Sequence, residues 1–115
     1  MRKIEISEHY FSTQIEDLLD TYHWVWIHFR PARIIKDGEE SWRTAVSGYK
    51  GFPDYVAIRP NDDGKCRLLF IELKGEKGKL NENQLEWAEL LSACSEVEYH
   101  LWRPSDFETA LEMLK

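Results

Sequence analysis

The sequence lacks the features that mark membrane, exported or disulfide-stabilised proteins. No apolar run approaches the roughly 18 residues of a membrane span, and the first residues, MRKIEISEHYF, contain no apolar core of an export signal. There are only two cysteines, Cys66 and Cys94, and their spacing is not that of a metal site. We therefore expect a protein of the cytoplasm, with both cysteines reduced in the core and no disulfide.

Several kinds of chemistry are also missing. Histidine and cysteine form no cluster with the spacing of zinc ligands, and no serine or cysteine is arranged as a nucleophile beside a base. The chain has no internal repeat and no low-complexity segment. Its 115 residues, with 43% hydrophobic and 31% charged residues, predict one globular domain that spans residues 1–115.

Positive charge is scarce overall but unevenly distributed. The net charge of -6 argues against a general nucleic-acid binder. Between Arg30 and Lys79, however, 11 basic residues face 8 acidic ones, whereas the rest of the chain has 4 against 13. A local excess of this kind is typical of a protein with one DNA-facing side. An acidic protein with scattered basic residues is the alternative reading.

The most informative stretch is residues 51–74, GFPDYVAIRPNDDGKCRLLFIELK. Two apolar runs, Tyr55–Ile58 and Leu68–Leu73, have the composition of strands. The turn-forming residues PNDDG lie between them. This pattern predicts two strands joined by a turn.

Charged residues stand at the ends of these two strands. Asp54 opens the first strand, and Glu72 and Lys74 close the second. Since side chains two residues apart share one face of a strand, Glu72 and Lys74 lie together, and the hairpin can bring Asp54 beside them. Two carboxylates and an ammonium at the end of an apolar strand predict a site for a cation or a substrate.

The remaining sequence alternates between helix and strand patterns. The predicted elements are a helix over Ser7–Tyr22 capped by Ser7, a strand over Trp24–Phe29 buried on both faces, a long irregular loop over Arg30–Lys50, a helix capped by Asn81, a strand over Val97–Arg103, and a helix over Phe107–Leu114 that begins with a capping box of Ser105 and Glu108. The apolar faces of the first two helices comprise Phe11, Ile15, Leu18, Leu19 and Tyr22, and Leu85, Ala88, Leu90 and Leu91.

The central residues match a known nuclease signature. Pro53 and Asp54, followed by Glu72, Leu73 and Lys74, fit the PD-(D/E)xK pattern. Together with the segments GFPD, LLFIELK, GKLNENQLEW and YHLWRPSD, they make nearly the whole chain resemble the virus-type replication-repair nuclease domain, VRR-NUC. The resemblance implies an α/β, restriction-endonuclease-like fold, in which a central mixed β-sheet is flanked by helices and the Glu72 strand lies in the middle.

The resemblance also implies a cofactor and a reaction. Asp54, Glu72 and the backbone carbonyl of Leu73 would bind Mg²⁺ or Mn²⁺ through hard oxygen ligands. Lys74 would orient a water or help to deprotonate it, and Gln84 would help to orient that water or the lysine. The implied reaction is metal-dependent hydrolysis of phosphodiester bonds in DNA.

One further ligand is implied by the relatives of this domain. An acidic residue at the start of the first helix often joins their metal site, and Glu8 is the matching position, with Glu5 as the alternative. An acid that stabilises the helix dipole is the simpler interpretation of Glu8.

The expected partners are DNA and a second copy of the chain. We expect branched DNA such as a Holliday junction, a homodimer, and the cytoplasm of a bacterial or phage-infected cell. Basic residues interleaved with aromatic ones suit a DNA backbone, and the predicted contacts are Arg30, Arg33, Lys36, Arg43, Lys50, Lys77 and Lys79. The alternatives are a catalytically silent DNA-binding module, a nuclease without structure preference, and a hydrolase directed at RNA or nucleotides.

Overall fold

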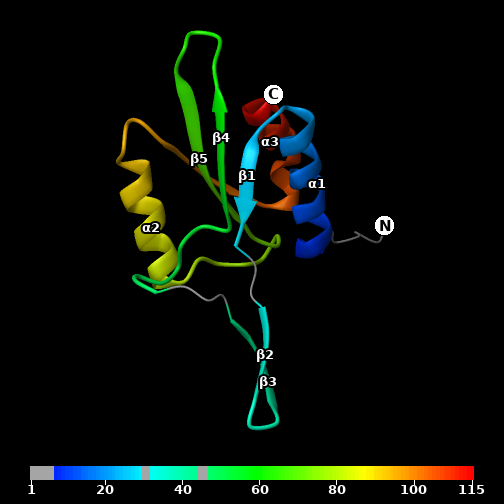
Figure 1. Cartoon of the computed structure of the whole chain (residues 1–115). Coiled ribbons are helices and arrows are strands. Elements are labelled where there is room, and N and C mark those ends of the chain that lie inside the picture. Colours follow the sequence, from blue (N-terminus) through cyan, green and yellow to red (C-terminus); the bar gives the residue numbers. More distant parts are fainter. Residues whose placement is uncertain (1–6, 30–31, 44–46) are drawn as a thin grey trace.

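The computed structural model describes residues 7–29, 32–43 and 47–115 (Figure 1). Two residues predicted for the site, Glu5 and Arg30, lie outside these ranges. In chain order the elements are α1 (Glu8–Thr21), β1 (Val25–His28), β2 (Ala32–Lys36), β3 (Glu39–Arg43), β4 (Tyr55–Pro60), β5 (Cys66–Leu73), α2 (Glu82–Ser92), β6 (Glu98–Trp102), the short 3₁₀ helix η1 (Pro104–Asp106) and α3 (Phe107–Leu114).

A mixed four-stranded sheet forms the centre of the fold. Its strand order is β1-β4-β5-β6, and β5 runs antiparallel to β4 and parallel to β6. The strand that carries Glu72 is therefore an interior strand, as predicted. The sheet and its flanking helices confirm the predicted α/β fold of the restriction-endonuclease type (Figure 1).

One face of this sheet is covered by α1 and α3, which pack against each other (Figure 1). The Oγ of Ser7 accepts the N–H of Tyr10 at 3.1 Å and caps α1, as predicted. The apolar side of α1 then faces the sheet, because its apolar residues recur at helical spacing. The core on this face comprises Phe11, Ile15, Leu19, Trp24, Tyr55, Ala57, Leu69, Ile71, Leu73, Trp102, Ala110 and Leu114.

The other face is covered unevenly. Helix α2 packs along β6, at the far edge of the sheet from β1. Val25 and Ile27 of the edge strand β1 are consequently 72% and 53% exposed. The prediction that residues 24–29 are buried on both faces is therefore wrong, because α1 covers only one side of that strand.

Helix α2 itself is less buried than its pattern predicted. Asn81 caps it, as predicted, and Ala88 is buried. Leu85 and Leu90 are 49% and 59% exposed, because the helix lies at one edge of the sheet and has β6 behind only part of its surface. The predicted apolar face is thus only partly buried.

The segment predicted as an irregular loop contains a β-hairpin. Strands β2 and β3 pair antiparallel, and Asp37 and Gly38 form the turn with φ angles of 54° and 77°. Two residues at positive φ are typical of a type I′ hairpin turn, for which Asp-Gly is a preferred sequence. In Figure 1 this hairpin extends away from the four-stranded sheet. Within the described part of the predicted loop, residues 47–50 contain no helix or strand, and the following residues 51–54 contain none either.

Two smaller predictions also fail. The N–H and hydroxyl of Ser105 both donate to the Glu76 carboxylate, and Asp106 closes the turn by accepting the N–H of Arg103 at 2.8 Å. Ser105 therefore lies inside η1 and does not form the predicted capping box. Cys66 and Cys94 are free, as predicted, but both are exposed and neither belongs to the core.

Candidate active site

The hairpin of β4 and β5 brings Asp54 and Glu72 together. Because Tyr55 pairs with Ile71, the residue before Tyr55 comes opposite the residue after Ile71. The Asp54 N–H donates to Glu72 Oε2 at 3.2 Å, and the Leu73 N–H donates to Asp54 Oδ2 at 2.9 Å. Both carboxylates are thereby held by backbone groups of the two strand ends, which fixes their relative position.

The environment of Glu72 is unfavourable for a negative charge. Its side chain is only 1% exposed, and among the described residues no donor reaches its second oxygen, Oε1. Burial, followed by a hydrogen bond and charge repulsion from Asp54, raises the pKa of Glu72 well above its ordinary value. A buried carboxylate with one unpaired oxygen beside a second carboxylate is an arrangement that a cation would stabilise.

Lys74 lies at the edge of this carboxylate pair. Its N–H donates to the Trp102 carbonyl at 3.1 Å, which continues the pairing of β5 with β6 beyond Leu73. Its ammonium group is close enough to oppose the rise in the pKa of Glu72. Lysine and carboxylates therefore share one end of the sheet.

The donor set fits a hard divalent cation. Asp54 and Glu72 offer carboxylate oxygens, and the unpaired Oε1 of Glu72 is the strongest sign of an expected ligand. No group of three or more histidine, cysteine, aspartate or glutamate side chains with the geometry of a metal site occurs in the described part of the chain. Glu8 is exposed at the start of α1. Its role as a metal ligand, like that of the Leu73 carbonyl, stays a prediction.

Gln84 lies in the first turn of α2 and completes its cap. The Gln84 N–H donates to Asn81 Oδ1 at 2.9 Å, and Gln84 Oε1 accepts the Asn81 N–H at 3.0 Å. The side-chain oxygen is therefore engaged within the helix terminus, and the amide NH₂ is the group with which Gln84 could act on a substrate or water.

Sequence reasoning missed Tyr99, which lies on the same side of the sheet as Glu72. It pairs with Phe70, two residues before Glu72 on the neighbouring strand. Burial, together with the charges of Glu72 and Asp54, raises the pKa of Tyr99 to about 12. The phenol therefore stays protonated at neutral pH and can donate a hydrogen bond. Only the parallel register of β5 and β6 reveals this placement, and the sequence carries no local signal for it.

A partly buried polar cluster around Tyr55, the residue that follows Asp54, was also missed. The Tyr55 hydroxyl donates to Glu16 Oε2 at 2.5 Å, and the Tyr55 ring stacks on His28 with ring centroids 4.0 Å apart. His28 Nδ1 lies 3.3 Å from the same Glu16 oxygen. Burial and the Glu16 carboxylate raise the pKa of Tyr55 far above its usual range. This cluster ties α1, β1 and β4 together next to the candidate site.

The predicted DNA-binding residues fall into two groups. Lys36 is exposed near the tip of the β2–β3 hairpin, and Arg33 and Arg43 occupy positions in its two strands. Lys50, Lys77 and Lys79 are exposed in the segments that precede Asp54 and follow Lys74. Lys50, Lys77 and Lys79 are therefore close in sequence to the residues of the candidate site. The other three belong to the β2–β3 hairpin, which extends away from the four-stranded sheet.

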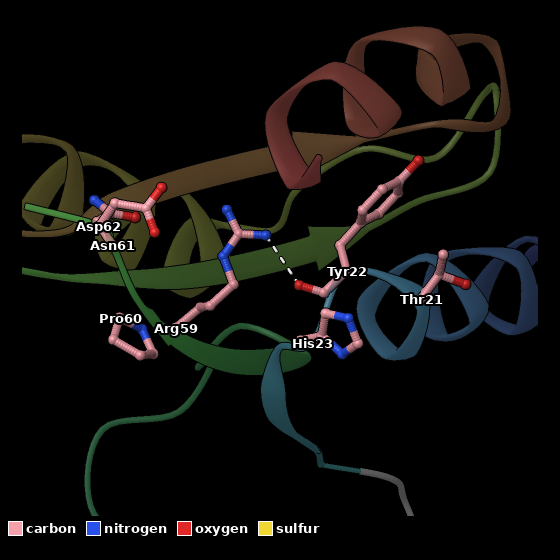
Figure 2. Close-up of a pocket in the computed structure, with 7 residues that line it drawn as sticks. All are labelled: Thr21, Tyr22, His23, Arg59, Pro60, Asn61 and Asp62. Carbon is pink, nitrogen blue, oxygen red and sulfur yellow. Dashed lines mark hydrogen bonds between the residues drawn. The ribbon is translucent and has the colours of Figure 1, made fainter.

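A surface pocket of about 490 Å³ lies at the opposite end of β4 from Asp54. Figure 2 shows its lining, which comprises Thr21, Tyr22, His23, Arg59, Pro60, Asn61 and Asp62. The Arg59 guanidinium donates to the carbonyls of Tyr22, Leu114 and Lys115 and lies over the Trp24 ring. Its donors therefore join the carboxyl ends of α1 and α3, and the pocket offers no comparable set of groups for chemistry.

A mixed sheet between helices, with paired carboxylates and a lysine at one end, defines an α/β nuclease-like protein. The family model of the VRR-NUC domain matches residues 30–103. The chain therefore belongs to the VRR-NUC family, a family of nucleases, and the match includes Asp54, Glu72, Lys74 and Gln84. Comparison with curated proteins and with solved structures found no match. Within the described residues, no helix is long and apolar enough to cross a membrane.

Proposed function

We propose that the chain is a Mg²⁺- or Mn²⁺-dependent DNA endonuclease whose active site is the Asp54–Glu72–Lys74 group. The observation that carries this proposal is the buried Glu72, whose Oε1 has no donor among the described residues and whose Oε2 is held beside Asp54. An unpaired buried carboxylate oxygen is unfavourable in a folded protein unless a ligand uses it. Membership of a nuclease family supports the reaction.

Each residue has a role that follows from its position. The Leu73 N–H orients Asp54, and the Asp54 N–H orients Glu72, so both carboxylates are pre-positioned for the cation. When bound, the cation supplies Lewis acidity toward the phosphodiester. Lys74 balances negative charge at the strand end and orients the attacking water, and the Gln84 amide NH₂ helps to hold that water.

The substrate is proposed to be DNA, gripped by the exposed basic residues around the site. Lys50, Lys77 and Lys79 border the carboxylates, and Lys36 and the hairpin strands extend the surface available to a DNA backbone. The excess of basic over acidic residues in this central region of an acidic protein supports one DNA-facing side. We place this activity in the cytoplasm of a bacterial or phage-infected cell.

The proposed assembly is a homodimer that acts on branched DNA. Exposed aliphatic residues support an interface. Val25 of β1 pairs with Ile58 of β4, and Ile27 lies two residues further along β1 on the same uncovered face of the sheet. Four of the tryptophans add little to such an interface, because Trp24 and Trp102 are buried and Trp26 and Trp87 are partly buried. Two sites related by a two-fold axis would suit paired cuts across a junction.

A catalytically silent DNA-binding module is the second candidate. It predicts DNA binding without cleavage, whereas the intact Asp54, Glu72 and Lys74 favour an enzyme.

The test is a cleavage panel of single-stranded, duplex, flap and four-way-junction DNA and RNA with Mg²⁺, with Mn²⁺ and with EDTA. Asp54→Asn, Glu72→Gln and Lys74→Ala should each abolish metal-dependent cleavage while the fold is retained. Full cleavage in EDTA would refute the proposal, and cleavage of all DNA forms at equal rates would refute only the preference for branched DNA.

A further inference from the structure

The segment that leads into Asp54 passes unusually close to α2. At Gly51, with φ of 89°, a β-carbon would lie 2.7 Å from the Asn83 carbonyl carbon, 2.7 Å from the Gln84 nitrogen and 2.8 Å from the Asn83 β-carbon. These distances are far below van der Waals contact, and two of the three atoms are backbone atoms that cannot rotate away. Only glycine permits this contact between the chain before Asp54 and the first turn of α2.

The contact is reinforced by side chains on both sides of Gly51. The Trp87 Nε1–H donates to the Lys50 carbonyl at 2.9 Å, and the Tyr49 hydroxyl donates to Glu86. Phe52 packs edge-on against Trp87 with ring centroids 5.0 Å apart, and against Phe70 of β5 at 5.7 Å. Residues 49–52 therefore contact four residues of α2, namely Asn83, Gln84, Glu86 and Trp87. They also contact β5 through Phe70, and Asp54 follows two residues later (Figure 1).

These observations place Gly51 between two parts of the candidate site. Gly51 precedes Asp54 by three residues, and Pro53 between them is buried, which leaves little freedom for independent movement. On the other side, Gly51 touches the backbone of Gln84 itself. A shift of α2 by the width of a methyl group would therefore change the position of Gln84 relative to Asp54.

We propose that Gly51 is a positioning residue, whose missing side chain lets the first turn of α2 seat against the Asp54 segment and sets Gln84 relative to the carboxylates. This inference rests on the proposed function, since it assigns Gln84 a task at the Asp54–Glu72 site. Gly51 contacts neither substrate nor cation and acts through Gln84. Misplacement of a catalytic group by about 1 Å can reduce the rate about 100-fold.

The test compares three glycines with similar backbone conformation. Gly48 and Gly64 have φ angles of 100° and 84°, but a β-carbon at either position meets nothing within 4 Å. Gly48→Ala and Gly64→Ala therefore introduce the same backbone strain as Gly51→Ala without the collision. Gly51→Ala should reduce kcat for DNA cleavage about 10- to 100-fold with KM nearly unchanged, whereas the two controls should stay within about twofold of the wild type.

A double substitution separates positioning from general damage. If Gly51 acts through Gln84, adding Gly51→Ala to Gln84→Ala should reduce kcat by less than about twofold further. Independent multiplication of the two losses would overturn the proposal, and so would equal activity of Gly51→Ala and Gly48→Ala. If Gly51→Ala does not fold, Trp87→Phe loosens the same contact by removing the hydrogen bond to Lys50, and it should show the same non-additivity with Gln84→Ala.

A readout that does not need activity distinguishes this inference from the proposed function. Hydrogen exchange at the Gln84 and Leu85 amides, which donate to Asn81, should accelerate in Gly51→Ala relative to Gly64→Ala, because the first turn of α2 loses its support. Unchanged exchange at these amides would contradict the proposed seating of α2. Accelerated exchange in a protein that cleaves no DNA would leave the contact in place and refute only the nuclease assignment.

Discussion

Glu72→Gln should make the metal-free protein more stable while removing its activity. The carboxylate is 1% exposed, and its pKa is raised above the ordinary value of 4.5 by burial and by Asp54. The charged form is therefore disfavoured in the folded state. Glutamine keeps an oxygen acceptor for the Asp54 N–H, and its amide NH₂ can donate to the Asp54 carboxylate, so the uncharged side chain fits the same space.

The expected gain follows from the cost of charging Glu72 at neutral pH. If the folded protein retains the proton at pH 7 while the unfolded chain titrates at its ordinary value, the free energy of unfolding falls by about 1.4 kcal/mol for each pH unit above that value. The loss at pH 7 is then about 3.4 kcal/mol at most. We expect Glu72→Gln to raise the free energy of unfolding by about 1 to 3 kcal/mol at pH 7, and the Tm by roughly 4 °C per kcal/mol.

The pH dependence has a definite sign. Because the folded state binds the Glu72 proton more tightly than the unfolded state, wild-type stability falls as the pH rises above the ordinary carboxyl pKa. Glutamine does not titrate, so the gain from Glu72→Gln should be smallest near pH 4 and larger at pH 7 and 8. Glu98→Gln is the control, because the ion pair with Arg67 lowers the pKa of Glu98, and its substitution should destabilise the protein at pH 7.

The assay is thermal unfolding followed by circular dichroism in EDTA at several pH values, and then with Mn²⁺. Mn²⁺ at 100 times its Kd should stabilise the wild type by about 2.7 kcal/mol and leave Glu72→Gln nearly unchanged. The reasoning fails if Glu72→Gln is less stable than the wild type in EDTA at pH 7, or if its difference from the wild type does not vary with pH.

Three further predictions address DNA, Tyr99 and assembly. Arg33→Ala or Arg43→Ala should weaken DNA binding across sequences and reduce the slope of log K against log salt by about 1, and an unchanged slope in both variants would make the hairpin a purely structural extension. Tyr99→Phe should reduce cleavage roughly tenfold by removing a neutral donor beside Glu72 and Asp54, whereas the exposed control Tyr10→Phe should not change the rate. Light scattering should give a dimer mass at micromolar concentration. Val25→Lys should lower this mass, whereas the control Leu90→Lys, at another exposed apolar residue, should not, and a monomeric wild type would refute the dimer.

The parts of the structure that sequence patterns predicted well are those set by local contacts. Ser7 and Asn81 cap their helices because each side chain reaches an N–H only three residues away. The hairpin of β4 and β5 follows from two apolar runs and a turn, and its register alone brings Asp54 beside Glu72. For these elements the physical cause lies within a few residues, so a single sequence contains it.

The failures share a different cause. The burial of β1, the exposure of Leu85 and Leu90, and the placement of Tyr99 all depend on which element packs where on the sheet. The Asp37–Gly38 turn was a local signal that the basic and aromatic composition of its surroundings obscured. Ser105 has the sequence of a capping box but binds Glu76, which lies 29 residues earlier, so a distant partner replaced a local one.

Gly51 shows how these two levels combine at the candidate site. Its sequence context suggests only a sharp turn into Pro53 and Asp54, and its positive φ agrees with that role. The turn alone would tolerate asparagine or aspartate at a small energetic cost. The approach to the backbone of Asn83 and Gln84 imposes a second and stricter requirement, because no side chain fits there. The same glycine therefore satisfies a local turn and a long-range contact, and the second requirement links the hairpin that holds the carboxylates to the helix that carries Gln84.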